Sequence, residues 1–256
     1  MTKAGELLRE WRQRRRMSQL DLAIAADVSA RHVSLVETGK SRPSAEMVLR
    51  LAERLDVPLL ERNRILLAAG HAPKYRERAF TARDLGAAYE AVTAVIRAHE
   101  PYPALVIDGG WNLVAHNRAL DPFLTGIAPR LLEPPVNLVR LALSPDGLAP
   151  RLVNLDQVRA VLRGRLSRQL ERTGDPAIAA LYEEFLAWGP EGSVSAEEEI
   201  ATPMIVRHEG GDLKFFSTIT TFGTPQDITL EGIAIESYYP ADESTAAILR
   251  AIVGGR

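Results

Sequence analysis

The stretch SQLDLAIAADVSARHVSLVETGKSRPS, residues 18–44, predicts two short helices joined by a tight turn, because its apolar residues recur at helical spacing. Ser18, Ser29 and Ser44 each stand directly before such a run, where a serine oxygen accepts a hydrogen bond from an unpaired amide. Ala23 is small at the position where two steeply crossing helices approach most closely. The stretch therefore predicts a closely crossed helix pair with a further helix after Ser44.

The turn and the second helix have their own residue requirements. Asp27 takes the turn position usually filled by glycine, and aspartate tolerates the left-handed conformation better than most residues. Gly39 predicts the end of the second helix, because glycine adopts the C-terminal left-handed cap without steric penalty. Val33 and Val36 supply the stripe that faces inward, and Val28 fills the turn. The outward side then presents Ala30, Arg31, Ser34 and Leu35.

The front of the chain is helical and basic. Between Ala4 and Gly70 the apolar spacing predicts five short helices, the first with Leu7, Leu8 and Trp11 on its inner face. Residues 1–80 contain 16 Lys+Arg and 10 Asp+Glu, a net charge of +6, so the rest of the chain carries −8 of the total of −2. This asymmetry favours a front end that approaches a polyanion, with a chance fluctuation as the alternative.

Length and composition exclude several classes of protein. A chain of 256 residues is long enough for one large domain or two modest ones. No apolar run approaches the roughly 18–20 residues that span a bilayer, and the start lacks a secretory signal, so a cytoplasmic location without a membrane partner is expected. The absence of cysteine excludes disulfides, thiolate metal ligands and a cysteine nucleophile.

The sequence contains no recognisable catalytic motif. Its five histidines lack close metal-ligand spacing, and it has neither a phosphate-binding glycine-rich loop nor a nucleophile elbow. The acidic run Glu197, Glu198 and Glu199 is typical of a solvated loop. We therefore expect no enzyme, no metal and no cofactor.

Residues 5–70 resemble the lambda-repressor-like, or XRE-type, helix-turn-helix transcription regulators. The likeness rests on MSQLDLA, VSARHVSLVETGK, RPS and MVLRLAERLDV, in which small, apolar and capping positions fall at the required offsets. It implies an all-α, five-helix DNA-binding domain over residues 1–72, with a double-stranded DNA operator as its partner. In such domains the second helix of the pair enters the major groove by its N-terminal end.

The resemblance implies two kinds of DNA contact. Arg31 is expected to fork onto a guanine, and Ala30 or Leu35 to pack against a thymine methyl, with Ser34 beside them at the base edges. The residues expected at phosphates or alongside are Gln19, Ser29, His32, Lys40 and Arg42. Without the surrounding motif, Arg31 and His32 would indicate only a solvated helix face. A further cluster is expected to neutralise phosphates, or to offset the helix dipole, and comprises Arg12, Arg14, Arg15 and Arg16.

A homodimer is expected, because one small domain contacts only a few base pairs and operators consist of paired half-sites. Residues 73–101 form the expected linker and connecting helix, since HAPKYRERAFTARD breaks the helical pattern before it. Within the connecting helix, apolar residues repeat at intervals of four, three and four, namely Leu85, Tyr89, Val92 and Ile96. This stripe either pairs with its twin across a dimer axis or packs on its own domain.

Residues 102–256 change to a pattern of strands and helices. ALVID and WNLVAH, on either side of a Gly-Gly turn, predict a hairpin, and a helix follows that begins after Asn117. Helices are then expected over 156–172 and 176–188, strands over 201–208, 212–223 and 228–239, and a last helix from Asp242. This order predicts an α+β domain with an antiparallel sheet that helices cover on one face.

The order of these elements is similar to a PAS-like fold. More narrowly, DGGWNLVAHNRAL, with a leucine-rich helix and a late hairpin after it, resembles the MmyB-like ligand-binding domain of bacterial XRE-type regulators. The likeness covers residues 102–240 and implies a small apolar, fatty-acid-like effector between sheet and helices. The expected ligand contacts are Trp111, His116, Asn117, Trp188, Phe215, Phe222 and Tyr238. The alternative for each of them is a packing role, and for Asn117 a helix cap.

These features give one leading hypothesis and two alternatives. The leading hypothesis is a sequence-specific transcription regulator whose back domain senses a ligand and alters the spacing of two DNA-binding heads. In the first alternative the back domain is a dimerisation or docking platform without a small molecule, and side chains fill its sheet-helix interface. The second alternative is an enzyme tethered to DNA, which requires a polar cleft with convergent ionisable groups.

Overall fold

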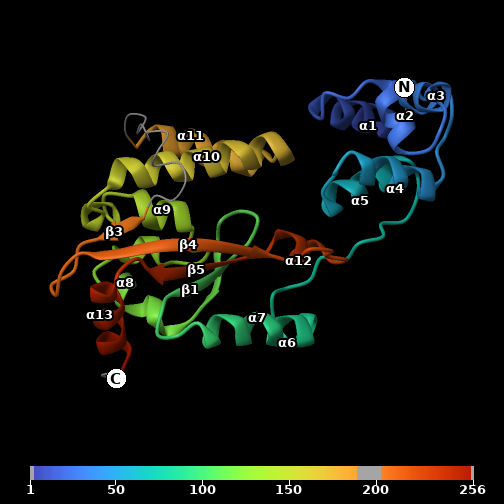
Figure 1. Ribbon diagram of the computed structural model, residues 1–256. Coiled ribbons are helices and arrows are strands. Elements are labelled where there is room, and N and C mark those ends of the chain that lie inside the picture. Colours follow the sequence, from blue (N-terminus) through green and yellow to red (C-terminus); the bar gives the residue numbers. More distant parts are fainter. Residues whose placement is uncertain (1–2, 189–202, 255–256) are drawn as a thin grey trace. The chain divides into compact units, whose positions relative to one another are not determined.

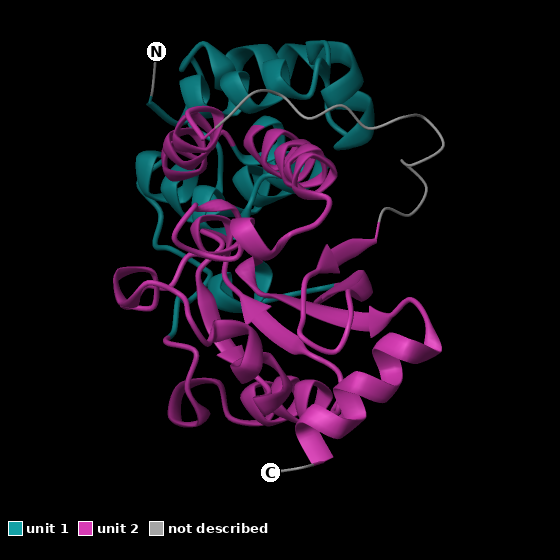
Figure 2. Cartoon of the chain, turned by 90° about the vertical axis from the view of Figure 1, so that its left-hand side faces the viewer, with its two compact units in different colours: residues 1–78, 171–173, 224–231 teal, residues 79–170, 174–223, 232–256 magenta. Residues whose placement is uncertain are grey.

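The computed structural model describes residues 3–188 and 203–254, and the contacts within the chain divide it into two compact units (Figure 2). The first unit comprises residues 1–78 with the short segments 171–173 and 224–231, and the second comprises the rest. Among the described residues, no helix is both long enough and apolar enough to cross a membrane.

The front of the first unit consists of five short helices, as the sequence predicts (Figure 1). They are α1 (Lys3–Arg14), α2 (Gln19–Ala25), α3 (Ala30–Glu37), α4 (Ala45–Arg54) and α5 (Leu59–Ala68). Their inner faces share one apolar core, which includes Leu8, Trp11, Leu22, Val33 and Leu51. Helices of this length are marginal in water when isolated, so shared burial supplies most of their stability.

Serine caps begin three of these helices at the predicted positions. Oγ of Ser18 accepts a hydrogen bond from the amide of Asp21 at 3.0 Å, and the Asp21 carboxylate accepts one from the amide of Ser18 at 2.8 Å. This reciprocal pair is a capping box at the start of α2. Ser29 and Ser44 each accept a bond from the amide three residues later, at the starts of α3 and α4. Each cap satisfies an amide that has no partner inside its helix.

The crossing of α2 and α3 depends on the small and apolar residues identified in the sequence. Ala23 is buried, and it belongs to the same core as Val33 and Val36 of α3. In the turn, Asp27 has a φ of 53°, which is the left-handed conformation predicted for it. Gly39 has a φ of 73° just after α3. The helix pair therefore has the geometry that the sequence predicts.

The described strands of the second unit form a five-stranded sheet in the order β2-β1-β5-β4-β3, with every neighbouring pair antiparallel. The strands are β1 (Ala104–Ile107), β2 (Leu113–His116), β3 (Met204–Val206), β4 (Leu213–Thr221) and β5 (Ala234–Pro240). This confirms the predicted α+β domain with an antiparallel sheet. Residues 201 and 202 of one expected strand, and the acidic run 197–199, lie outside the described residues.

Helices cover both faces of this sheet, whereas the sequence predicts only one covered face (Figure 1). The described helices that follow α5 along the chain are α6 (Ala82–Leu85), α7 (Ala87–Ala98), α8 (Asp121–Leu124), α9 (Leu138–Leu143), α10 (Leu155–Thr173), α11 (Pro176–Leu186), α12 (Ile228–Gly232), most of which belongs to the first unit, and α13 (Glu243–Gly254), with the 3-10 helices η1 (Arg118–Leu120), η2 (Pro129–Leu131) and η3 (Ala149–Arg151).

The central strand β1 explains the difference, because all four of its residues are buried. Leu105 and Ile107 belong to the core formed with α9, α10 and α11. Ala104 and Val106 belong to the core on the other face, together with residues of α7. A strand buried on both faces is a continuous apolar run, and ALVI is such a run.

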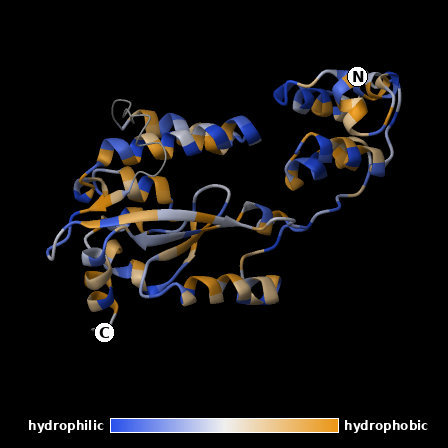
Figure 3. Ribbon diagram, in the orientation of Figure 1, coloured by the Kyte–Doolittle hydropathy of each residue, from blue (hydrophilic) through white to orange (hydrophobic). Residues whose placement is uncertain are grey.

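The apolar stripe of the connecting helix packs on its own domain. Gly86 has a φ of 50° and separates α6 from α7 within what the sequence predicts as one helix. Leu85, Val92 and Ile96 are buried, and the last two share a core with Val106 of the sheet. Figure 3 shows α7 mainly in the hydrophobic colour. The domain's own sheet therefore covers these residues, as one of the two predicted alternatives has it.

The predicted strand over residues 228–239 is wrong at its start. Residues 228–232 form α12, and β5 begins at Ala234. Oδ1 of Asp227 accepts a hydrogen bond from the amide of Thr229 at 2.9 Å, which caps the first turn of this helix. The cap and the glycine at position 232 outweigh the strand preference of Ile228 and Thr229.

Candidate functional site

Helix α3 turns one side into the core and the other to solvent. Val33, Val36 and Glu37 are buried, so they fix which side faces outward. Arg31 is exposed in the first turn, where the helix amides and dipole favour negatively charged groups. The other residues expected at base edges are half-buried, namely Ala30, Ser34 and Leu35. The four predicted base-edge residues are thus all accessible to some degree.

The residues expected at phosphates differ in how far the domain already uses their side chains. Nε of Arg42 donates to the carbonyl of Ala69 at 3.0 Å, just after α5. The hydroxyl of Ser29 caps α3, and His32 is half-buried in its first turn. Lys40 is exposed shortly after the end of α3. Lys40 therefore offers an exposed cation beside the accessible side of the helix.

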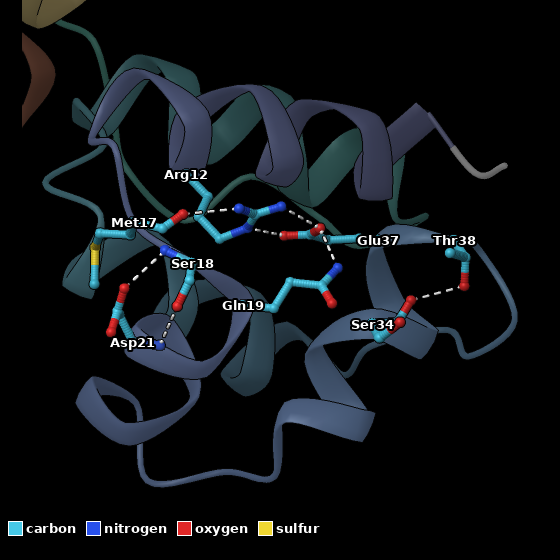
Figure 4. Close-up of polar contacts among 8 residues, drawn as sticks. All are labelled: Arg12, Met17, Ser18, Gln19, Asp21, Ser34, Glu37 and Thr38. Atoms are coloured by element: carbon cyan, nitrogen blue, oxygen red, sulfur yellow. Dashed lines mark hydrogen bonds and ion pairs between the residues drawn. The ribbon is translucent and has the colours of Figure 1, made fainter.

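A buried ion pair fixes α3 against α1 and α2 (Figure 4). Nε and Nη2 of Arg12 donate to the two carboxylate oxygens of Glu37 at 2.7 and 2.8 Å, and Nη1 donates to the carbonyl of Met17 at 2.8 Å. Gln19, expected at a phosphate, donates from Nε2 to the same carboxylate at 2.8 Å. Burial raises the pKa of Glu37, but the hydrogen bonds from Arg12 and Gln19 outweigh it and hold that pKa below its usual value. Glu37 is thus a charged carboxylate that joins three helices.

The arginine cluster near the end of α1 is divided between the interior and the surface. The expectation that Arg12 neutralises phosphates is wrong, because its guanidinium is buried against Glu37. Arg15 donates to the carbonyls of Leu55 and Asp56 at 2.8 and 2.9 Å, and its guanidinium carbon lies 5.2 Å from the centre of the Trp11 ring. Successive residues of a helix point about 100° apart, so arginines that are close in the sequence do not all lie on the same face. The phosphate contact of Arg15 stays a prediction.

The second unit has a cavity of about 120 Å³ between its sheet and helices. Most of its wall is aliphatic, with side chains from β1, α9 and α10 that include Leu105, Leu141, Val158 and Leu162. Val161 of α10 also lines it and is 42% exposed. An apolar wall with a few polar groups is typical of sites for small molecules.

Arg165 and Glu236 form the charged part of the cavity wall. Nη1 and Nη2 of Arg165 donate to the two oxygens of Glu236 at 3.0 and 3.3 Å, and their side chains are only 16% and 3% exposed. The Arg165 guanidinium carbon also lies 4.5 Å from the centre of the Trp111 ring, and Nε1 of Trp111 donates to Gln169 at 2.7 Å. The ion pair carries no net charge. Glu236 and Trp111 both contact the Arg165 guanidinium and fix its position.

Tyr238 lies in the cavity wall beside this ion pair. Burial raises the pKa of its hydroxyl well above the usual value, and the negative charge of Glu236 raises it further. The hydroxyl therefore stays protonated at neutral pH and can act as a donor. Ser217 stands opposite Tyr238 on β4 and lines the cavity as well.

The structure brings two of the seven expected ligand contacts into the cavity wall, Phe215 and Tyr238. Trp111 stands behind Arg165 and positions it. Trp188 packs against the core on the α10 face, and Phe222 against the core on the α7 face. His116 is exposed at the end of β2.

Asn117 acts as a brace for the backbone. Its side-chain oxygen accepts a hydrogen bond from the amide of Ala104 at 3.1 Å. Its side-chain nitrogen donates to the carbonyls of Ile96 and Tyr102 at 2.9 and 2.8 Å. The 3-10 helix that follows has no side-chain cap from Asn117. This residue therefore ties the end of α7 to β1, which is neither of the two roles expected from the sequence.

The charged pair in the cavity wall was not predicted from the sequence. Glu236 follows Ile235 on β5, so their side chains point to opposite faces of the sheet. Glu236 lies on the same side of the strand as Tyr238, toward the cavity. A carboxylate at an inward position of an apolar strand signals a buried partner. That partner, Arg165, is 71 residues away, so no local spacing identifies it. The aromatic residues that the sequence suggested as ligand contacts instead pack mainly in the cores.

Comparison with known proteins agrees with this two-part structure. Residues 4–65 match a helix-turn-helix domain, and residues 88–252, more than half of the chain, match the MmyB-like transcription regulator ligand binding domain. The chain belongs to the helix-turn-helix transcription regulators with an MmyB-like ligand-binding domain. It is 31% identical to the uncharacterized HTH-type transcriptional regulator RghRB of Bacillus subtilis (strain 168) over 109 residues, which is 40% of this chain and 74% of that protein.

In this MmyB-like regulator the two matched regions contain the two candidate sites. The helix-turn-helix match includes α3 with its accessible side. The ligand-binding match includes the cavity and its ion pair. Both matches are to transcription-regulator families and not to enzyme families.

Proposed function

We propose that the protein is a homodimeric, sequence-specific transcription regulator in which α3 contacts an operator and the cavity binds a small apolar effector. The main supporting observation is the accessible side of α3, held outward by the buried pair of Arg12 and Glu37. Exposed Arg31 stands beside the smaller Ala30 and Ser34, and this combination suits close approach to base edges in the major groove. Two copies then contact half-sites about one helical turn apart.

The cavity supports an effector over a purely structural role for the second unit. A docking platform without a ligand predicts a sheet-helix interface filled by side chains. A cavity of about 120 Å³ is instead close to the roughly 150 Å³ of an engineered apolar cavity that holds benzene. An effector regulates only if it binds the two arrangements of the DNA-binding heads with different affinity, so operator DNA must change effector affinity by the same factor.

Arg31→Ala and Lys40→Ala are expected to weaken DNA binding in different ways. If Arg31 contacts a guanine, its loss removes about 1–3 kcal/mol of discrimination at one base pair. Lys40→Ala instead weakens binding to all duplexes by a similar factor and flattens the salt dependence, because it removes a phosphate contact. The measurement is titration of both variants with the best duplex selected from random DNA, and with single-base changes of it, at several salt concentrations.

The comparison between the two variants is itself the control. Both remove one exposed cation near the same helix, so a general loss of positive charge affects them equally. The same profile of base preference and salt slope in both variants would contradict the division into base and phosphate contacts. A wild-type chain with no salt-sensitive binding to any duplex would overturn the proposal for the first unit.

Fluorobenzene is expected to bind the cavity with one molecule per chain. It is uncharged and close in size to benzene, so it fits the volume and the aliphatic wall. Ala142 of α9 lines the cavity, and Ala142→Phe is expected to fill it and to remove binding. Fluorine NMR of the ligand, titrated against full-length protein, measures both results.

Ala180→Phe is the matched control, because Ala180 is an exposed residue of α11. It adds the same side chain to a neighbouring helix without entering the cavity wall. This variant should bind fluorobenzene like the wild type. Equal binding by the Ala142 variant, or no saturable binding by the wild type, would argue against an effector site here.

A further inference from the structure

The polar groups of the cavity set a limit on the chemistry of the effector. We propose that its polar end is an uncharged hydroxyl that donates to Glu236, so that the effector is an alcohol and not a free carboxylic acid. This inference rests on the proposed function, because it assumes that the cavity is the effector site. It keeps the apolar body of the fatty-acid-like effector that the sequence implies and replaces its acid end by a hydroxyl.

Arg165 is already paired within the cavity wall. Two of its guanidinium nitrogens donate to the two oxygens of Glu236, and its charge lies over the face of Trp111. Gln169 in turn fixes Trp111, since it accepts from Nε1 at 2.7 Å and donates to the carbonyl of Gly109 at 2.6 Å. Turning Arg165 toward a ligand would break contacts on both sides. These contacts fix the guanidinium in the cavity wall, so it is not free to bind an anion.

The net charge of the site disfavours a ligand that brings another negative charge. Glu236 is 3% exposed, so it depends on Arg165 for stabilisation of its charge. An ionised ligand carboxylate in the same cavity would share one guanidinium with Glu236. Two carboxylates that compete for one cation in a poorly solvated site repel each other, and one of them must take up a proton. Among the described residues, the other polar groups of the wall are Ser217 and Tyr238, and neither is a second cation.

The cavity wall offers a ligand a hydrogen-bond acceptor and an apolar surface. Each carboxylate oxygen accepts more than one hydrogen bond, so Glu236 can accept another donor beside Arg165. Tyr238 lines the cavity beside Glu236 and has a hydroxyl that can donate a hydrogen bond. A ligand hydroxyl donates to the carboxylate and leaves the ion pair intact, while its apolar body contacts the leucine and valine wall. The cavity volume limits the enclosed part of the ligand to about the size of one benzene ring.

The test compares 4-fluorobenzyl alcohol with 4-fluorobenzoate, which have nearly the same size and differ in the charge of the polar end. Fluorine NMR with full-length wild-type protein at pH 7 should give at least about tenfold tighter binding of the alcohol, because only the acid adds a buried charge. This comparison needs no variant. Equal or tighter binding of the benzoate would overturn the inference while leaving the effector site in place.

Glu236→Gln supplies the second measurement, because it leaves Arg165 without its carboxylate. The ratio of the affinity for the alcohol to the affinity for the benzoate should fall by about tenfold or more. Glu184→Gln is the matched control: Glu184 pairs with Arg140 at 2.7 Å, in a bridge whose side chains are 36% and 46% exposed, and its loss should leave the preference unchanged. An unchanged preference in a folded Glu236→Gln protein would contradict the role given to the ion pair.

The two proposals fail in distinguishable ways. If fluorobenzene binds and depends on position 142, but neither the alcohol nor the benzoate binds better than fluorobenzene itself, the hydroxyl contact is wrong and the cavity site stands. If none of the three compounds binds saturably, the effector site itself is wrong.

Discussion

Arg12→Met is expected to destabilise the helix-turn-helix by about 3–5 kcal/mol, because it leaves the Glu37 carboxylate charged and buried without its cation. The pair joins α1 to the last residue of α3, and Gln19 adds the start of α2. Its loss should therefore loosen all three helices together and abolish DNA binding. Hydrogen exchange of peptides from residues 3–70 in the full-length protein measures the local free energy of opening.

Two comparisons separate the ion pair from a general effect of charge removal. Arg50→Met breaks the exposed pair with Glu46, 3.0 Å long, and should change stability by less than about 0.5 kcal/mol. The double variant Arg12→Met with Glu37→Met should recover much of the loss, since no unpaired charge remains. Equal stability of the wild type and the Arg12 variant would contradict the role of the pair.

The pH dependence of the same pair has a defined sign. The folded-state pKa of Glu37 lies below its unfolded value, since the hydrogen bonds from Arg12 and Gln19 outweigh the effect of burial. The stabilisation is therefore complete above the unfolded carboxyl pKa of about 4.3 and is lost as the pH falls through the folded-state value. Acid should thus destabilise the wild-type helix-turn-helix more than it destabilises the Arg12 variant.

The sequence predicts the local part of the first unit because its signals are local. Ser18, Ser29 and Ser44 act on amides within their own first turns, and Asp27 acts on its own backbone. Helix starts, turn conformation and the small crossing residue follow from such signals. The partner of Arg12 is 25 residues away, so the same reasoning grouped Arg12 with its exposed neighbours. The accessible side of α3 was predictable, but the contact that holds it was not.

In the second unit, the sheet was more predictable than the cavity. Alternating apolar segments with turns between them indicate an antiparallel sheet. β1 and β4 lie within the predicted ranges, and β5 overlaps its predicted range but ends one residue later. The cavity depends on side chains from separate strands and helices, and its charged residues come from α10 and β5. The one local signal was the inward position of Glu236, since a buried carboxylate requires a partner. Its identity required the tertiary structure.

Gly5→Ala is expected to separate α1 from α3, with a loss of about 3 kcal/mol, at the upper end of what an added methyl costs in a packed core. A Cβ atom at position 5 would meet the carbonyl oxygen of Val36 and would lie 2.7 Å from that of Glu37. Both are backbone atoms at the end of α3, so no side-chain rotation relieves the overlap. The displacement also opens the Arg12–Glu37 contact, which couples the loss of packing to an unpaired buried charge.

Gly164→Ala is the matched control, because Gly164 also lies inside a helix, α10. A Cβ atom there would meet the end of a flexible side chain, with Nη1 of Arg168 at 3.3 Å. Without a backbone clash, the helix preference of alanine over glycine should stabilise α10 by up to about 1 kcal/mol. Hydrogen exchange of α1 and α10 peptides measures the two effects in parallel, and opposite signs are the expected result. Stabilisation at both positions would mean that α1 and α3 move apart at no cost, so that close approach at Gly5 does not determine how α3 is presented to DNA.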